Sequence, residues 1–194
     1  MEQVYGKIRI LEEKRTGRSR ADVVMVLPDK VCGIEIKSDA DSYARLASQV
    51  KDYDRYYDLN IVAVGTSHAS HIEEHVPAHW GIITVEELPE GPDFYFLRHP
   101  LDNPDLKPEN KIEILWRPEL ARIQERNDMP KYKEKSKDFV RKKILEKVDP
   151  KLLAVQISDE LFERDYTAIE ETIRQFRAEN RPQKRKRKRT RRKY

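Results

Sequence analysis

The chain has 194 residues, of which 38% are charged and 38% hydrophobic. This length fits one sizeable domain, or one domain with a small appendage. No apolar stretch approaches the roughly 20 residues of a membrane-spanning helix, and the single cysteine, Cys32, excludes an intrachain disulfide or a cysteine-based zinc site. The N-terminus lacks the basic start and apolar core of a signal peptide, so we expect a cytoplasmic protein without a membrane partner.

The net charge of +4 is unevenly distributed along the chain. Residues 181–194 hold ten Lys or Arg and no acid, which leaves 29 basic and 35 acidic residues, a net charge of −6, in the other 180. This tail has no apolar residue before Tyr194, so we expect it to be disordered when free. It predicts salt-dependent nucleic-acid binding, through Arg185, Lys186, Arg187, Lys188, Arg189, Arg191, Arg192 and Lys193. A localisation signal, a solubility extension or another acidic partner are the alternatives.

Alternating and apolar runs predict strands over residues 7–12, 22–27 and 32–37, with a polar loop over 14–20. In the third strand, alternation directs Ile34 and Ile36 into a core and Glu35 and Lys37 to the opposite face. A turn through residues 28–30 folds the second strand back on the third. Asp22 is therefore expected close to Glu35 and Lys37.

The middle of the chain alternates between helix and strand patterns. A helix is predicted over residues 41–57, a buried strand over 61–64, a short helix over 72–75 and a strand over 82–85. Strand–helix–strand units are crossovers, so the last two strands should lie parallel in one mixed sheet.

Prolines punctuate the region after residue 88. Residues 94–97 predict an edge strand, and 109–127 a helix that Pro118 kinks or restarts. Further helices are predicted over 134–148, 150–163 and 166–179, with Pro150 suited to a helix start. The expected organisation is a core over residues 1–100, a mainly helical extension over 101–180 and the basic tail over 181–194. The fold class is α/β, with a mixed sheet and flanking helices.

Asp22, Glu35 and Lys37 carry the chemistry of this arrangement. Two carboxylates can hold a hard divalent cation, and a neighbouring lysine can stabilise developing charge or help activate a water. An ordinary half-exposed hairpin of alternating charges is the structural alternative. Because both strands are apolar, the hairpin is expected at the centre of the sheet, where inward-facing charges need a reason.

Asp22 followed by Glu35-x-Lys37 on the next strand resembles the core of the PD-(D/E)XK nuclease superfamily, with Ala21 in place of its proline. Gln49 and Tyr53, four residues apart on one helix face, resemble the Gln-x-x-x-Tyr motif of the RecB-type exonuclease branch. The amino-acid sequence around both motifs is similar to that of an uncharacterised family of nuclease-like proteins from bacteria and their phages. The resemblance covers residues 8–86 well and extends more weakly to about residue 165.

This resemblance implies a restriction-endonuclease-like core and a Mg²⁺-dependent (or Mn²⁺-dependent) DNA nuclease, which acts in the host cytosol if a phage encodes it. Asp22, Glu35 and the Ile36 carbonyl would be metal ligands, joined by Glu12 as the upstream acid. Lys37 would act on the water and the phosphate. Gln49 and Tyr53 would complete the catalytic set by orienting the lysine or positioning the scissile phosphate. RNA stays open as a substrate.

The rival interpretation is a non-catalytic module that keeps the nuclease fold and binds nucleic acid, or a protein partner through its C-terminal helices. The intact set of Asp, Glu and Lys disfavours it. A zinc site from His68, His71 and His75 on one helix face is conceivable. The segment is polar and lacks cysteine, so surface histidines are the better interpretation.

Overall fold

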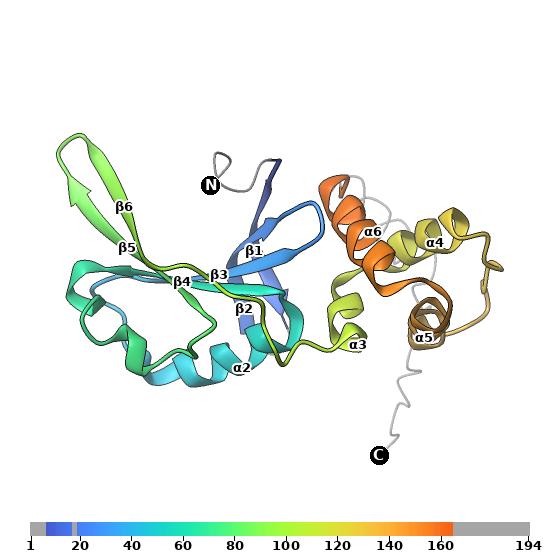
Figure 1. The fold of residues 1–194 in the computed structure, drawn as a ribbon, viewed down its shortest axis with the longest axis horizontal. Helices are drawn as coiled ribbons and strands as arrows, with labels where there is room; N and C mark the ends of the chain where they lie inside the picture. The colour runs from blue at the N-terminus through green and yellow to red at the C-terminus, as the bar shows by residue number, and fades with distance from the viewer. Residues whose placement is uncertain (1–6, 17–18, 165–194) are drawn as a thin grey trace, which may run out of the picture. The chain divides into compact units, whose positions relative to one another are not determined.

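The computed structural model describes residues 7–16 and 19–164. The chain divides into two units, residues 1–162 and 163–194, and all helices and strands that the structure describes lie in the first. Six strands form one sheet in the order β1 to β6 (Figure 1). Their bounds are β1 Arg9–Thr16, β2 Ser19–Val26, β3 Val31–Lys37, β4 Leu59–Gly65, β5 Gly81–Leu88 and β6 Gly91–Arg98.

The sheet is mixed, as the sequence predicts. Strands β1, β2 and β3 pair antiparallel, β3, β4 and β5 pair parallel, and β6 returns antiparallel at the edge. The apolar run of β4 lies at the sheet centre, with Ile61, Val62 and Val64 fully buried on its two faces. The predicted α/β class with flanking helices is therefore confirmed.

Helices follow the predicted pattern with shifted bounds. The first is preceded by a short 3-10 turn, η1 (Tyr43–Arg45), and 3-10 turns η2 (Thr66–His68) and η3 (Ile72–Glu74) follow β4. Pro118 lies in the first turn of a new helix, which confirms a restart rather than a kink. The helical elements are α2 Leu46–Tyr56, α3 Pro108–Lys111 with turn η4 Ile112–Ile114, α4 Arg117–Arg126, α5 Lys137–Lys147 and α6 Pro150–Phe162.

The C-terminal helices are tied to the sheet region by partly buried polar contacts. Lys111 of α3 forms an ion pair with Asp58, with 2.7 Å between Nζ and Oδ2, and Arg9 of β1 donates to the Phe162 carbonyl at the end of α6. Within the described ranges, no helix is both long and apolar enough to cross a membrane. The predicted helix over 166–179 and the basic tail lie outside the described residues.

Two expectations about the first strands are wrong. Residues 14–20 are not simply a loop, because β1 continues to Thr16 and β2 begins at Ser19. Ile36 is not in a core, since its exposed fraction is 48%, whereas Glu35 and Lys37 on the opposite face are 1% and 5% exposed. Glu35 and Lys37 are buried because α2 covers their face, where Gln49 and Tyr53 contact Glu35.

Gly33 determines how closely α2 packs on that face. A Cβ atom at Gly33 would lie 2.7 Å from the ring of Tyr53 and closer still to the ring of Tyr57, both on or beside α2. Only glycine leaves room for these two rings, whose centroids are 5.5 Å apart. Close packing at Gly33 therefore determines how far the Tyr53 ring, which α2 carries, can approach the sheet.

Replacing Gly33 with alanine is expected to destabilise the protein by about 1–3 kcal/mol, because the tyrosine rings must move or leave their rotamers. Chemical denaturation of wild type and Gly33→Ala measures this difference. The double variant Gly33→Ala with Tyr57→Leu should recover part of the loss, since it removes the nearest ring. Equal stability of wild type and Gly33→Ala would show that the packing at this position is loose.

Candidate functional site

The site begins where the ladder between β2 and β3 ends. Paired residues run from Val26–Val31 to Val23–Ile34, and the next position, Asp22, is not part of the ladder. Instead, the Ile36 backbone N–H donates to Asp22 Oδ2 at 2.9 Å. A side-chain oxygen thus takes the role of a backbone acceptor and fixes the Asp22 carboxylate against β3.

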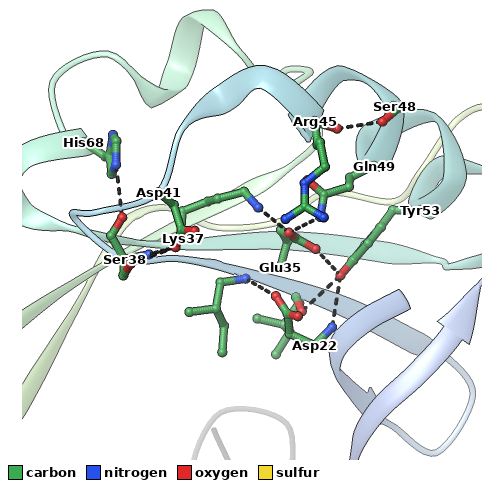
Figure 2. A network of polar contacts seen from close by, with 12 residues as sticks. Asp22, Glu35, Lys37, Ser38, Asp41, Arg45, Ser48, Gln49, Tyr53 and His68 are labelled. Carbon is green, nitrogen blue, oxygen red and sulfur yellow. Dashed lines mark hydrogen bonds and ion pairs between the residues drawn. The ribbon is translucent and has the colours of Figure 1, made fainter. Parts of the chain in front are cut away.

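The Glu35 carboxylate accepts three hydrogen bonds although it is almost fully buried. Lys37 donates from Nζ to Oε1 at 2.5 Å, and Gln49 also donates to Oε1 through Nε2. The Tyr53 hydroxyl donates to Oε2 at 2.7 Å. Figure 2 shows the donors converging on this one carboxylate, with Asp22 beside it. A buried charge needs such partners to be tolerated.

Tyr53 links the two acidic residues. Its hydroxyl oxygen lies 3.3 Å from the Asp22 backbone nitrogen, which donates to it, and the hydroxyl donates to Glu35 Oε2 at the shorter distance of 2.7 Å. Burial, followed by the charge of Glu35, raises the pKa of Tyr53. The hydroxyl therefore stays protonated and remains a donor across the physiological pH range.

An open cleft of about 860 Å³ adjoins these groups. Asp22, Glu35, Ile36, Lys37 and Gln49 line it, whereas Tyr53 lies behind Glu35 under α2. The Gln49 Oε1 atom is buried and has no hydrogen-bond partner among the residues that the structure describes. The cleft is also lined by residues that sequence reasoning did not assign to the site: Asp41, Arg45, Ser48, Lys51 and Asp52.

Glu12 does not join this site. It pairs with Val23, and Val23 pairs with Ile34, so these three side chains share the sheet face opposite to Asp22 and Glu35. Its assignment as a ligand fails because a one-residue step along a strand reverses the side-chain direction. The basic tail residues, 185–193, lie outside the described residues.

Two of the histidines pack on an aromatic side chain. The rings of His68 and His75 pack on Tyr43, with centroid separations of 4.8 and 4.1 Å. His68 Nε2 also lies 3.1 Å from the Ser38 carbonyl oxygen. In residues 7–16 and 19–164, no group of three or more His, Cys, Asp or Glu is arranged to hold a metal ion.

Asp41 closes the turn that follows Lys37 by accepting hydrogen bonds from Ser38. The Ser38 backbone N–H and hydroxyl both donate to Asp41 Oδ2, at 2.8 and 2.7 Å. These hydrogen bonds are the main cause of the lowered pKa of Asp41, with smaller contributions from Lys37 and Arg45. The turn between β3 and η1 is thereby held in place at the mouth of the cleft.

Comparisons with known proteins place the chain in a family. A search of curated protein sequences finds no significant match. A structure of Pyrococcus furiosus SfsA in complex with Ca²⁺ is similar with a TM-score of 0.30 and 13% identity, over 53% of this chain and 56% of that one. The chain thus spans little more than half the length of that solved protein. The family described as Bacteriophage P4 protein cII matches residues 9–186, and the chain belongs to this family.

Proposed function

We propose that this protein is a metal-dependent nuclease that hydrolyses phosphodiester bonds of DNA at a site of the PD-(D/E)XK type. The observation that carries the proposal is the convergence of Lys37, Gln49 and Tyr53 on the buried Glu35 carboxylate, with Asp22 fixed beside it at an open cleft. A structural ion pair needs no open cleft and no second carboxylate.

The donor set fits a hard divalent cation such as Mg²⁺ or Mn²⁺. Asp22 and Glu35 both line the cleft and offer carboxylate oxygens, and Ile36 lines the same cleft. Mg²⁺ keeps several waters and is commonly held by only one or two carboxylates, so a cluster of three acids is not required. Asp22 Oδ1 accepts no hydrogen bond from the described residues, which leaves it available as a ligand.

The reaction needs a water, a phosphate and a proton acceptor in one place. The water oxygen forms a bond to phosphorus, the bond from phosphorus to the leaving sugar oxygen breaks, and the proton lost by the water balances the one gained by the leaving oxygen. When bound, the cation would supply Lewis-acid stabilisation and a more acidic water. Lys37 Nζ, a three-proton donor, would hold the water and stabilise charge on the phosphate oxygens.

The remaining residues act by orientation. Tyr53 and Gln49 hold Glu35 through both carboxylate oxygens, which sets the direction of its free lone pairs. Asp22 is fixed by the Ile36 N–H. Such preorganisation is the main source of electrostatic catalysis, because the dipoles need not reorganise during the reaction.

The rival proposal is a binding module that uses the same fold without catalysis. On α6, Leu152 and Val155 are 47% and 41% exposed, which would suit a protein partner. The nuclease proposal is preferred because it accounts for the site, whereas the binding proposal leaves the buried charges of Glu35 and Lys37 without a purpose.

The test is a cleavage assay with the full chain. Linear duplex, single-stranded and branched DNA, together with an RNA of the same sequence, are incubated with Mg²⁺ or Mn²⁺ and, in parallel, with EDTA. We expect fragments from at least one DNA substrate with the metals and none with EDTA. A protein that binds these substrates but leaves all of them intact would favour the binding module.

A further inference from the structure

We propose that Arg45 and Lys51 bind backbone phosphates of the nucleic-acid strand and so align it with Glu35 and Lys37. This inference rests on the proposed function, which it deepens by assigning a phosphate-binding edge of the cleft. The two residues line the same cleft of about 860 Å³ as the acids. Arg45 is the last residue of the 3-10 turn η1, and Lys51 lies in the middle of the helix α2 that follows it.

The helix directs Arg45 to the cleft. Arg45, Ser48 and Asp52 are separated by three and four residues, so they share the face of α2 that also carries Gln49. Figure 2 shows the Arg45 side chain reaching down beside Gln49 towards Glu35. The Ser48 hydroxyl donates to the Arg45 carbonyl at 2.8 Å, which steadies the turn that presents the guanidinium.

The two cations are available for a ligand. Both side chains are exposed, and neither forms an ion pair with the residues that the structure describes. Arg55, on the same helix, contrasts with them, because it lies 3.6 Å from the Glu113 carboxylate and stacks over the Tyr56 ring. Arg55 does not line the cleft.

The charge of the cleft explains why such residues are needed. Its lining carries four carboxylates against three cations, and residues 1–180 have a net charge of −6. A polyanion is therefore repelled unless cations stand where the phosphates pass. A guanidinium can hold a phosphate through two parallel N–H donors, and an ammonium adds a point charge next to it.

The experiment measures binding of the full chain to a labelled DNA oligonucleotide, duplex and single-stranded, in EDTA at several salt concentrations. Arg45→Ala, Lys51→Ala and the double variant are compared with wild type and with Arg55→Ala, the matched control on the same helix. Each lost phosphate contact should reduce the slope of log affinity against log salt by about 0.7–0.9. Arg55→Ala should keep the wild-type slope. Arg45→Lys should restore the slope while it recovers only part of the affinity.

Wild-type affinity and slope in Arg45→Ala and in the double variant, or an equal loss in Arg55→Ala, would overturn the inference. Kinetics with Mg²⁺ separate it from the proposed function. We expect a higher KM in Arg45→Ala, with kcat less affected than in Glu35→Gln. If wild type cuts DNA and Arg45→Ala binds and cuts like it, the inference fails and the nuclease remains. If wild type does not cut but Arg45→Ala loses a contact, the nuclease proposal fails and the phosphate-binding edge remains.

Discussion

Replacing Lys37 with alanine is expected to lower the cleavage rate by about 10²–10³-fold, because the reaction loses a donor at the developing charge. The same change leaves the Glu35 carboxylate, 1% exposed, without its cation. Breaking a buried pair by removing one partner typically costs about 3–5 kcal/mol, so the variant should also be less stable. Activity must therefore be compared at a temperature where circular dichroism shows that both proteins are folded.

A double variant separates the structural from the catalytic role of Lys37. Lys37→Ala combined with Glu35→Gln removes both charges, so most of the lost stability should return while cleavage stays absent. Glu35→Gln and Asp22→Asn, which keep shape but remove an anionic ligand, should also fail to cut. If Lys37→Ala, Glu35→Gln and Asp22→Asn all cut DNA at the wild-type rate, the site is a structural ion pair.

Deleting the chain after Asn180 is expected to cause the second large change, a loss of affinity for DNA. Residues 181–194 hold ten cations, whereas residues 1–180 carry a net charge of −6, so the truncated protein should bind DNA much more weakly and with a flatter salt dependence. Thermal stability should barely change, since the deleted segment has no apolar residue except Tyr194. Cleavage at saturating DNA and low salt should persist, because Asp22, Glu35 and Lys37 remain.

The measurement is a titration of duplex DNA at several salt concentrations with the full chain and the truncation. A chain with the tail cations changed to glutamine serves as the control for length. Equal affinities and equal slopes for the full chain and the truncation would show that the tail does not attract DNA. A localisation signal or an acidic protein partner would then be the better interpretation.

Much of the sheet could be predicted because its signals are local. The apolar run of β4 and the alternation of β3 each identify a strand without knowledge of the rest. The strand structure of residues 14–16 and 19–20 is not visible in the sequence, because these residues are polar and their strands are defined by pairing with each other. Pairing between strands is not visible in composition.

The candidate site was predictable in part for the same reason. The spacing of Gln49 and Tyr53 places them on one helix face, but their hydrogen bonds to Glu35 depend on how α2 crosses the sheet. Burial of Glu35 and Lys37 together with exposure of Ile36 also depends on that crossing. Arg45 cannot be distinguished from Arg55 in the sequence, because only the assembled cleft separates the two side chains.

The claim that Asp22 and Glu35 hold a divalent cation is the one on which the proposed nuclease depends. It is tested most directly by growing crystals of the protein, soaking them in Mn²⁺ and recording anomalous scattering, with Glu35→Gln crystals treated in the same way. We predict an anomalous peak within ligand distance of the Asp22 and Glu35 carboxylates in the wild type and a much weaker peak in Glu35→Gln. Wild-type crystals with no peak there, and with Lys37 still paired to Glu35, would contradict the account.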